Sequence, residues 1–468
     1  AILIVLYYLA VGSQAGNPPV KPNDLTSSLE DQEEVSVTVY NSNIGLVKEL
    51  RNIRLLKGLT DLKFTDVAAQ IMPQTVHIKS ISDPSGLEVH EQNYEYDLLT
   101  PQKLLDKFVG KEIRVLKDGT EVPVTILSTN SGLVYRIGDQ IFTDYPGKLI
   151  FPGLPENLMA KPTLVWLLEN RFDRPQKIEA AYLTQGINWK ADYVATLNNE
   201  DSEMDLTGWI TLDNKSGTTY RNARLKLVAG DVNRVLAGHD LREGVMRLDE
   251  MSAKASSSQF IEKAFFEYHL YSLQRPTTIK DNQTKQVSLL SANKIPVKKR
   301  FIYYGADFYY RSRHGVPVSN QKVGVYVEVA NKEENHLGIP LPKGTIRLYK
   351  EDTDKSLQFI GEDQIDHTPK DETIKIKMGE AFDLVAERRQ TDWRKISDNI
   401  YEMAFEVSIR NHKDSKVAIN VIEPIPGDWE ILNSSHEYKK IEAHTVQFDI
   451  PVEKDREAKL KYRVRVKL

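Results

Sequence analysis

Five corners, each an asparagine at the end of a strand-like run, constrain the fold of this chain more than any other feature. The corners are Val39–Asn41, Leu168–Asn170, Leu212–Asn214, Val329–Asn331 and Ile409–Asn411. After each asparagine, a short polar run precedes renewed apolar alternation. Asparagine suits such a corner because it tolerates a left-handed backbone and its side chain can bond to its own turn. The pattern predicts stacked antiparallel β-sandwiches, and it names no chemistry.

Length and charge narrow the class of protein. A chain of 468 residues predicts about two to four domains. Its 62 basic and 66 acidic residues nearly cancel, so the charge indicates neither a nucleic-acid partner nor a basic membrane patch. The sequence contains no cysteine, which excludes disulfides, a thiolate nucleophile and zinc held by cysteine. If it is exported, a chain of this size without cysteine fits a bacterial envelope better than a small secreted eukaryotic module.

Residues 1–15 resemble the remnant of a secretory signal peptide. Residues 1–12 form an apolar run that is too short to cross a bilayer as a helix. Small residues at Ser13 and Ala15 follow it and predict cleavage after Ala15. We therefore expect an exported protein of the bacterial periplasm or cell surface, with no transmembrane span in the mature chain. An uncleaved membrane anchor is the alternative. Neither a methionine nor a basic stretch precedes the run, so residues that precede it in the protein could lengthen it to the span of a bilayer.

Composition and periodicity divide the rest of the chain into predicted segments. They are a flexible tether (16–34), an N-terminal β domain (35–99), a short helix with a small β-barrel (100–158), a central β-sandwich (159–235), an irregular loop with an aromatic-rich connector (236–298) and a C-terminal β-sandwich (299–468). Thr100, Pro101 and Gly110 predict the two ends of the helix. Glycine turns after it predict an SH3-like or Sm-like barrel. The predicted fold class is mainly β, with immunoglobulin-like sandwiches and few helices.

Two strands near the C-terminus show the clearest alternation. Residues 458–468 place apolar side chains on one face and lysines and arginines on the other. Residues 401–409 alternate likewise, with Glu402 and Glu406 on their polar face. We expect the two strands to pair, directly or across one neighbour, because opposite charges facing each other on a sheet attract. A basic surface for a polyanion is the alternative interpretation.

Several runs resemble a known bacterial family. Residues 184–193, 205–214 and 223–230 are similar to the core of the bacterial domain of unknown function 4139, and residues 361–367, 379–383 and 462–464 are similar to its C-terminal half. The similarity covers most of residues 35–468. Relatives called mucoidy-inhibitor-like imply the cell envelope or its polysaccharide and no reaction. Many of them carry a long coiled coil where this chain has the short helix and predicted barrel, and the family supplies no catalytic residues.

Familiar catalytic motifs are absent from the sequence. It contains no His-Glu-x-x-His pair, no Gly-x-Ser-x-Gly elbow, no phosphate-binding glycine loop and no EF-hand loop. Asp363, Asp366 and His367 come closest to a metal cluster, but a polar turn explains them equally well, and we predict no metal and no cofactor. Glu380 and Asp383 are the candidate carboxylate pair if the chain hydrolyses polysaccharide, and a tight turn before a strand is their alternative.

Aromatic residues crowd the interval 265–310. The candidate binding surface within it is Tyr303, Tyr304, Phe308, Tyr309 and Tyr310. Exposed aromatic side chains stack on sugars or anchor protein partners, and packing where two domains meet is the alternative. We expect a non-catalytic envelope protein that binds a protein or a polysaccharide. An exported polysaccharide hydrolase and a structural subunit of a surface assembly are the alternatives, and an exposed edge strand at 458–468 would serve the subunit.

Overall fold

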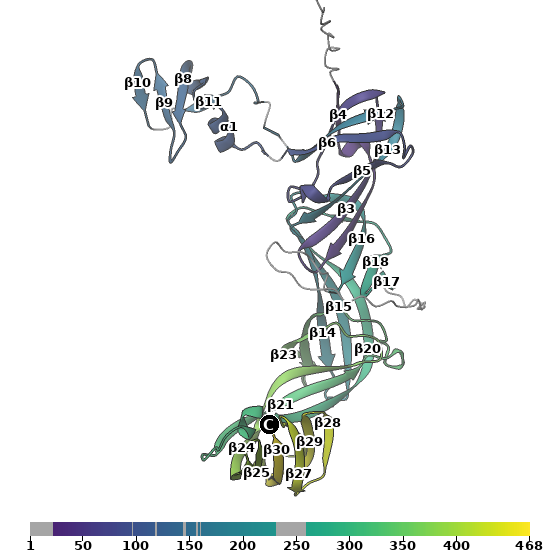
Figure 1. Cartoon of the computed structure of the whole chain (residues 1–468), viewed down its shortest axis with the longest axis vertical. Coiled ribbons are helices and arrows are strands. Elements are labelled where there is room, and N and C mark those ends of the chain that lie inside the picture. The colour runs from purple at the N-terminus through teal and green to yellow at the C-terminus, as the bar shows by residue number, and fades with distance from the viewer. Residues whose placement is uncertain are drawn as a thin grey trace, which may run out of the picture. The chain divides into compact units, whose positions relative to one another are not determined.

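The protein is built almost entirely from β-strands. The computed structural model describes residues 22–230 and 259–468, apart from Tyr96, Asp118, residues 144–146, residues 156–157 and Ala160. Strands dominate the described residues, and α1 (Pro101–Lys107) is the one α-helix among them (Figure 1). This confirms the predicted fold class. The predicted signal remnant and most of the predicted loop after residue 235 lie outside the described residues.

The chain forms two compact units, each assembled from several stretches of sequence. The first unit comprises residues 1–188, 213–226 and 275–283, and the second comprises residues 189–212, 227–274 and 284–468. Among the described residues, no helix is long and apolar enough to span a membrane. The predicted division into smaller domains stays a prediction.

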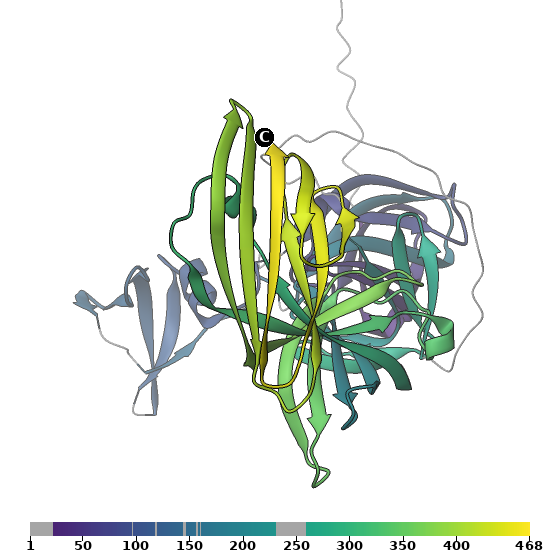
Figure 2. The same cartoon turned by 90° about the horizontal axis from the view of Figure 1, so that it is seen from below.

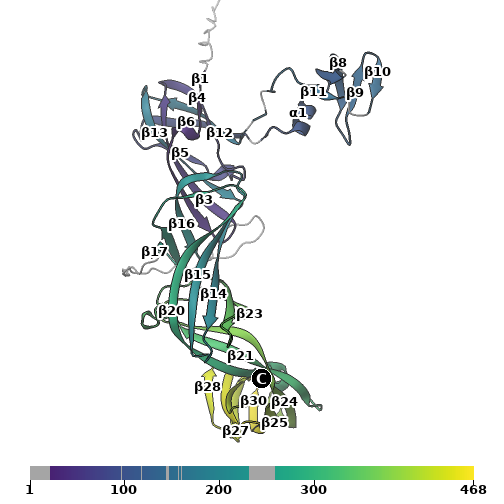
Figure 3. The same ribbon diagram turned by 180° about the vertical axis from the view of Figure 1, so that it is seen from behind.

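Two sheets form the body of the first unit. One contains β1 (Asn23–Ser27), β4 (Gly58–Thr65), β12 (Thr163–Asn170) and β6 (Leu87–Glu95) in that order. Figure 3 shows these strands from behind. The other includes β2 (Gln32–Tyr40), β3 (Ile44–Leu55), β13 (Arg174–Gln185) and β5 (His77–Ser80) in that order. Alternating side chains of both sheets are buried, among them Val37, Phe64 and Trp166. The rings of Phe64 and Trp166 meet edge to face with centroids 5.6 Å apart.

Part of the predicted tether is ordered β-structure. Strand β1 pairs in parallel with β4 from Asn23 to Ser27, and a 3-10 turn (Leu29–Asp31) joins it to β2. The tether was expected because this stretch has few apolar side chains. Backbone hydrogen bonds to β4, which do not depend on apolar side chains, hold it in the sheet instead. The part of the predicted tether before residue 22 lies outside the described residues.

The predicted helix is confirmed, but the barrel after it is not closed. Thr100 caps α1 by accepting a hydrogen bond from the Lys103 backbone N–H at 3.2 Å, and Pro101 is the first helical residue. The strands are β7 (Glu112–Lys117), β8 (Thr120–Ser128), β9 (Val134–Ile137), β10 (Gln140–Phe142) and β11 (Lys148–Ile150), in the order β10-β9-β8-β7-β11. Within the described residues the end strands β10 and β11 do not pair. Each has only three residues, which leaves little length for the tilt and stagger that closure requires.

The second unit contains most of a large sheet. Its strands include β23 (Leu357–Ile365), β22 (Gly344–Glu351), β14 (Ile187–Leu197), β15 (Glu203–Asn214), β20 (Gln283–Tyr304), β21 (Val318–Ala330), β24 (Thr373–Ser397), β25 (Ile400–Asn411), β30 (Arg456–Lys467) and β27 (Asp428–Ser434), in that order. Strand β26 (Val417–Pro424) pairs with β20 and with β29 (Thr445–Val452), which also pairs with β28 (Tyr438–Glu442). These strands enclose the core of the second unit's C-terminal part.

Regular strands occupy the segment predicted as an aromatic-rich connector. Strands β17 (Phe260–Phe265) and β18 (Tyr268–Leu273) form an antiparallel hairpin, and β19 (Thr277–Ile279) and β20 follow. The hairpin lacked a glycine or asparagine signal at its turn. Phe266 adopts the left-handed conformation there, with φ of 58°, which is rare for an aromatic residue.

The two C-terminal strands pair as predicted. Strands β25 and β30 are direct antiparallel neighbours, and Figure 2 shows the long green hairpin of β24 and β25 beside yellow β30. Glu402 lies opposite Arg465, with 2.8 Å between Oε1 and Nη2, and Glu406 lies opposite Lys461. The expected exposed edge at 458–468 was wrong, because β27 pairs with the other side of β30. Strand β30 is therefore an interior strand, with its backbone hydrogen-bonded to β25 and β27. Its lysines and arginines lie on the outer face of the sheet.

Four of the five asparagine corners are buried hydrogen-bonding centres. Asn170, Asn214, Asn331 and Asn411 are buried, whereas Asn41 is half-buried. None of these five described residues has a positive φ, so the expected left-handed backbone is wrong. The buried side chains instead donate to backbone carbonyls, and three of the four donate to the turn that follows.

The corners at Asn214 and Asn411 repeat the same bonding pattern. The Asn214 Nδ2 donates to the Thr218 carbonyl at 2.9 Å and to Lys280 at 3.0 Å. The Asn411 Nδ2 donates to the Ser415 carbonyl at 2.9 Å and to Glu453 at 3.2 Å. Each Oδ1 accepts a bond from the backbone N–H two residues later. A buried carboxamide therefore ties each turn to a neighbouring strand end.

Candidate functional site

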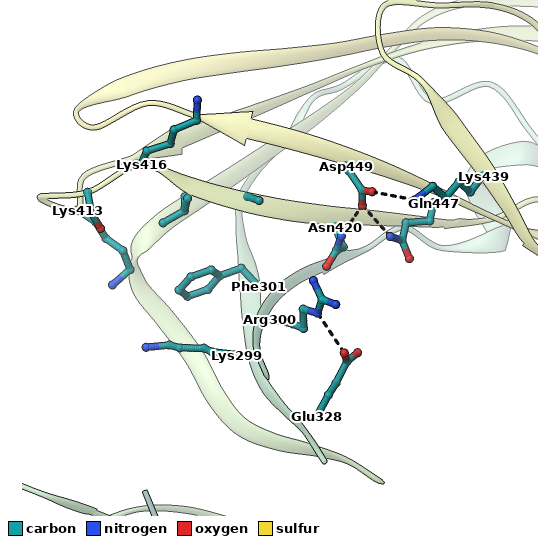
Figure 4. A pocket seen from close by; sticks show the side chains of 13 residues that line it. Lys299, Arg300, Phe301, Glu328, Lys413, Lys416, Asn420, Lys439, Gln447 and Asp449 are labelled. Atoms are coloured by element: carbon teal, nitrogen blue, oxygen red, sulfur yellow. Dashed lines mark hydrogen bonds and ion pairs between the residues drawn. The ribbon is translucent and has the colours of Figure 1, made fainter. Parts of the chain in front are cut away.

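A basic hollow in the second unit is the candidate site. Its volume is about 690 Å³, and it lies among β20, β21, β26, β28, β29 and the turn after Asn411 (Figure 4). The lining residues are Lys299, Arg300, Phe301, Glu328, Lys413, Ser415, Lys416, Val417, Ala418, Asn420, Lys439, Gln447 and Asp449. Five cationic side chains face two carboxylates there. The hollow is therefore locally basic although the whole chain has a net charge of -4.

Strand pairing brings the lining residues together from distant parts of the sequence. Strand β20 runs parallel to β26 from Phe301 opposite Ile419 to Tyr304 opposite Ile422. Strand β26 is antiparallel to β29, which places Asn420 directly opposite Asp449. Because side chains alternate along a strand, Phe301 and Lys299 project to the same side of β20.

Two lysines lie over the Phe301 ring. The Lys299 Nζ is 5.6 Å from the ring centroid, and the Lys413 Nζ is 5.8 Å from it. The two ammonium groups come from different elements, β20 and the turn that Asn411 holds. The Lys413 backbone N–H donates to the Asn411 Oδ1 at 2.9 Å, so the buried asparagine corner positions this lysine.

A polar network forms the other end of the hollow. Asp449 accepts hydrogen bonds from the side-chain amides of Asn420 and Gln447, the latter at 2.7 Å. The Lys439 Nζ lies 3.7 Å from the Asp449 carboxylate. Figure 4 shows this network apart from Phe301 and its two lysines. The hollow thus has one aromatic, cationic end and one end rich in amide and carboxylate groups.

Each cation of the hollow also has an acidic neighbour. Arg300 pairs with Glu328 at 3.0 Å, Lys413 with Asp383 at 3.5 Å and Lys416 with Glu453 at 2.6 Å. These pairs are partly exposed to solvent, and such pairs typically stabilise a protein by about 0–1 kcal/mol. A ligand therefore competes with weak partners for these cations.

Lys299 belongs to a three-residue ion cluster. The Asp201 carboxylate lies 2.7 Å from the Lys299 Nζ, and it also pairs with Lys350. Partial burial by itself raises the pKa of Asp201, but the hydrogen bonds from Lys299 and Lys350 outweigh this effect and lower its pKa below the ordinary value. Asp201 is therefore ionised at neutral pH, and it pairs with Lys350 as well as with Lys299, which lines the hollow.

The five aromatic residues of the candidate surface do not form one exposed face. Tyr303, Tyr309 and Tyr310 are buried in the core of the second unit, where they are packing residues. Tyr304 and Phe308 are 48% and 50% exposed. The alternation of β20 explains part of this separation, because neighbouring residues point to opposite faces.

The acidic candidates do not meet in the hollow either. Glu380 and Asp383 lie on β24, and neither belongs to the lining. Asp363 and His367 are engaged with backbone groups, since an Asp363 oxygen accepts from the Lys377 N–H at 2.6 Å and His367 Nδ1 accepts from the Lys343 N–H at 3.2 Å. In the part of the chain that the structure describes, no three His, Asp or Glu side chains are grouped to hold a metal ion.

The cations of the hollow were not among the residues predicted from the sequence. Phe301 belongs to the aromatic interval but was not selected, and the lysines of the hollow were not considered. One local signal existed: Lys298, Lys299 and Arg300 directly precede Phe301, and Lys413 and Lys416 lie in the polar run after the asparagine corner at Asn411. Only the strand order shows that these two runs face each other.

Comparison with known proteins agrees with the resemblance found in the sequence. The chain matches the family described as a domain of unknown function (DUF4139) over residues 178–468, which is more than half of its length and includes every residue of the hollow. A search of curated proteins gave no match. The chain therefore belongs to the family of the domain of unknown function 4139.

Proposed function

We propose that this chain is an exported, non-catalytic protein of the bacterial cell envelope that binds a glycan in the basic hollow. The observation that carries the proposal is the combination of the Phe301 ring with the amides of Asn420 and Gln447 and the carboxylate of Asp449. Aromatic faces pack on the apolar face of a sugar ring, and amides and carboxylates exchange hydrogen bonds with its hydroxyl groups.

Envelope location is part of the proposal. It is supported by the signal-like run of residues 1–15 and by the resemblance to mucoidy-inhibitor-like relatives. A hollow that is open to solvent is suited to a chain segment of an envelope polysaccharide. A protein partner in the same hollow is the second possibility, and the same variants test it.

The state of the two acids in the hollow favours binding over hydrolysis. Glycoside hydrolysis needs one protonated carboxyl group and a second carboxylate that is free to act as nucleophile or base. Glu328 already accepts from Arg300, and Asp449 accepts from Asn420 and Gln447. Both carboxylates are occupied as acceptors by neighbouring donors of the protein, which suits a fixed binding surface.

The test compares two aromatic residues of the same strand. Binding of the purified protein to a panel of purified bacterial envelope polysaccharides is measured by calorimetry, with Phe301→Ala as the variant and Tyr304→Ala as the matched control outside the hollow. Loss of one buried aromatic contact predicts roughly tenfold weaker binding for Phe301→Ala. Equal affinity of the parent and the Phe301→Ala variant would overturn the proposal.

A second measurement addresses the hydrolase alternative. The parent protein is incubated with the same polysaccharides, and released reducing ends are counted. We expect no release. Release that disappears in Glu328→Gln or Asp449→Asn would show a catalytic carboxylate pair and contradict a binding role, and the same assay on Glu380→Gln and Asp383→Asn covers the pair that the sequence suggested.

A further inference from the structure

We infer that the hollow selects sugar units that carry an anionic group, and that Lys299 and Lys413 recognise this group. The inference rests on the proposed glycan binding and adds the chemical class of the ligand. It is independent of the amide network, because it depends on the two ammonium groups beside Phe301.

The geometry around Phe301 carries the inference. Both ammonium nitrogens lie within 6 Å of the ring centroid, at 5.6 and 5.8 Å. Because both ammonium groups lie over the ring, an anionic substituent of a sugar unit held against Phe301 is within reach of the two lysines. A carboxylate, sulfate or phosphate substituent then gains charge-assisted hydrogen bonds that a hydroxymethyl group cannot match.

Both lysines are available to a ligand. Lys413 is 3.5 Å from Asp383, a loose and partly exposed pair. Lys299 shares Asp201 with Lys350, so Asp201 stays paired when Lys299 contacts a ligand. Engaging an anion therefore leaves no buried charge without a partner.

The charge distribution also sets the direction of the ligand. Glu328 and Asp449 repel an anionic group from their part of the hollow, and Figure 4 shows Asp449 away from Phe301. Lys416 and Lys439 line the hollow as well and attract a polyanion to it. We therefore expect a bound oligosaccharide to place its anionic sugar unit over Phe301 and its neutral hydroxyl groups near Asn420 and Gln447.

The test uses matched oligosaccharides with the full chain. The probes are a neutral glucan oligosaccharide, the same oligosaccharide oxidised at C6 to the uronate, and the same oligosaccharide sulfated at C6. The variants are Lys299→Gln, Lys413→Gln and both together, and Lys298→Gln is the matched control, an exposed lysine next to Lys299 that does not line the hollow. Thermal unfolding midpoints verify that each variant is folded.

The expected result is a preference of the parent for the anionic oligosaccharides of roughly tenfold or more at low salt, which decreases as salt rises. The double variant should lose this preference and keep its affinity for the neutral oligosaccharide, while Lys298→Gln should behave like the parent. A stronger response to the uronate than to the sulfate, or the reverse, identifies the anionic group.

Two results would overturn the inference, and only one of them also overturns the proposed function. Equal binding of neutral and anionic oligosaccharides by the parent overturns the selection of anions and leaves glycan binding intact. Failure of the parent to bind any oligosaccharide or polysaccharide overturns the proposed function as well.

Discussion

A single buried arginine organises the core of the second unit. The Arg388 guanidinium lies over the rings of Tyr309 and Phe405, 4.5 and 4.4 Å from their centroids, and donates hydrogen bonds to Glu423 and to the Tyr462 hydroxyl. The Arg388 and Glu423 side chains are 1% and 0% exposed. Burial alone lowers the pKa of Arg388, but the charge of Glu423 reverses this effect and raises it. Arg388 therefore stays charged within an aromatic core.

The first unit contains a comparable buried pair. Arg51 donates to the Glu49 carboxylate at 2.8 Å and lies over the Phe64 ring at 3.4 Å. The other Glu49 oxygen accepts from the Tyr182 hydroxyl at 3.0 Å. Such pairs add little net stability compared with apolar residues of the same volume, but they disfavour packings that leave either charge without a partner.

Removing one partner of the Arg388 pair should be severe. Glu423→Gln keeps the volume but leaves Arg388 charged and buried without a counter-ion, and we expect a loss of about 3–5 kcal/mol in the free energy of unfolding. Urea denaturation followed by fluorescence measures it. The double variant Arg388→Met, Glu423→Gln should recover part of the loss because no buried charge remains.

The matched control for this prediction is an exposed pair of the same unit. Glu406 lies 3.2 Å from Lys461 on the outer face of β25 and β30. Glu406→Gln should change the free energy of unfolding by less than about 1 kcal/mol. Equal effects of Glu423→Gln and Glu406→Gln would contradict the role assigned to the buried pair.

At the scale of elements, the asparagine corners connect the fold to the hollow. Asn411→Ala removes the donors to the Ser415 and Glu453 carbonyls and frees the turn that carries Lys413. We expect a loss of about 1–3 kcal/mol in the free energy of unfolding, because the buried Val452 carbonyl also loses its donor and the turn loses two partly buried bonds. Binding of anionic oligosaccharide should weaken as well. Chemical denaturation and calorimetry measure the two effects.

Two further corners serve as controls for Asn411→Ala. Asn214 makes the same set of bonds away from the hollow, so Asn214→Ala should lose similar stability and keep the affinity of the parent. Asn41 is only half-buried, and Asn41→Ala should have a smaller effect on stability. Weaker binding by Asn214→Ala that matches Asn411→Ala would show a general loss of stability and contradict the positioning of Lys413.

Sequence patterns predicted the elements well where they report which side chains are buried on one face. The opposite charges of β25 and β30 predicted their pairing, and the capping residue Thr100 predicted the start of the helix. The sequence patterns failed at β1, a polar strand that is held by its backbone hydrogen bonds to β4. They also failed at the turn of Phe266, where an aromatic residue stands in place of the usual glycine or asparagine.

The hollow was beyond prediction for a different reason. Its residues come from three separate runs, at 299–301, 413–420 and 439–449, apart from Glu328. Alternation gives the face on which each residue lies but not which strands are neighbours. The parallel pairing of β20 with β26 places Phe301 beside Ile419, and nothing in either run encodes that pairing.

At the scale of the whole molecule, buried tyrosines are spread through both units. Tyr182 and Tyr220 belong to the first unit, and Tyr193, Tyr271, Tyr303, Tyr310 and Tyr462 belong to the second. Burial raises the pKa of each of these seven hydroxyls above the ordinary value of 10.0. Deprotonating any of them in the folded state would create a buried anion.

This distribution predicts a steep loss of stability in alkali. The unfolded chain releases these protons near pH 10.0, whereas the folded chain holds them to higher pH. Above pH 10.0 the unfolded state therefore binds fewer protons, and the free energy of unfolding falls as the pH rises towards the folded pKa values. Each such tyrosine contributes a slope of up to about 1.4 kcal/mol per pH unit, so the total slope should be several times that of one group.

Urea denaturation from about pH 8 to about pH 11 measures this slope, and one tyrosine tests its origin. The Tyr193 hydroxyl donates to the Pro342 carbonyl at 2.7 Å. Tyr193→Phe should therefore cost about 1 kcal/mol at neutral pH, because that carbonyl loses its donor. Above pH 10.0 its stability should fall less steeply than that of the parent, because one titrating group is gone. Parallel pH profiles for the variant and the parent would show that Tyr193 takes no part, and a flat profile for the parent would refute the prediction for the whole molecule.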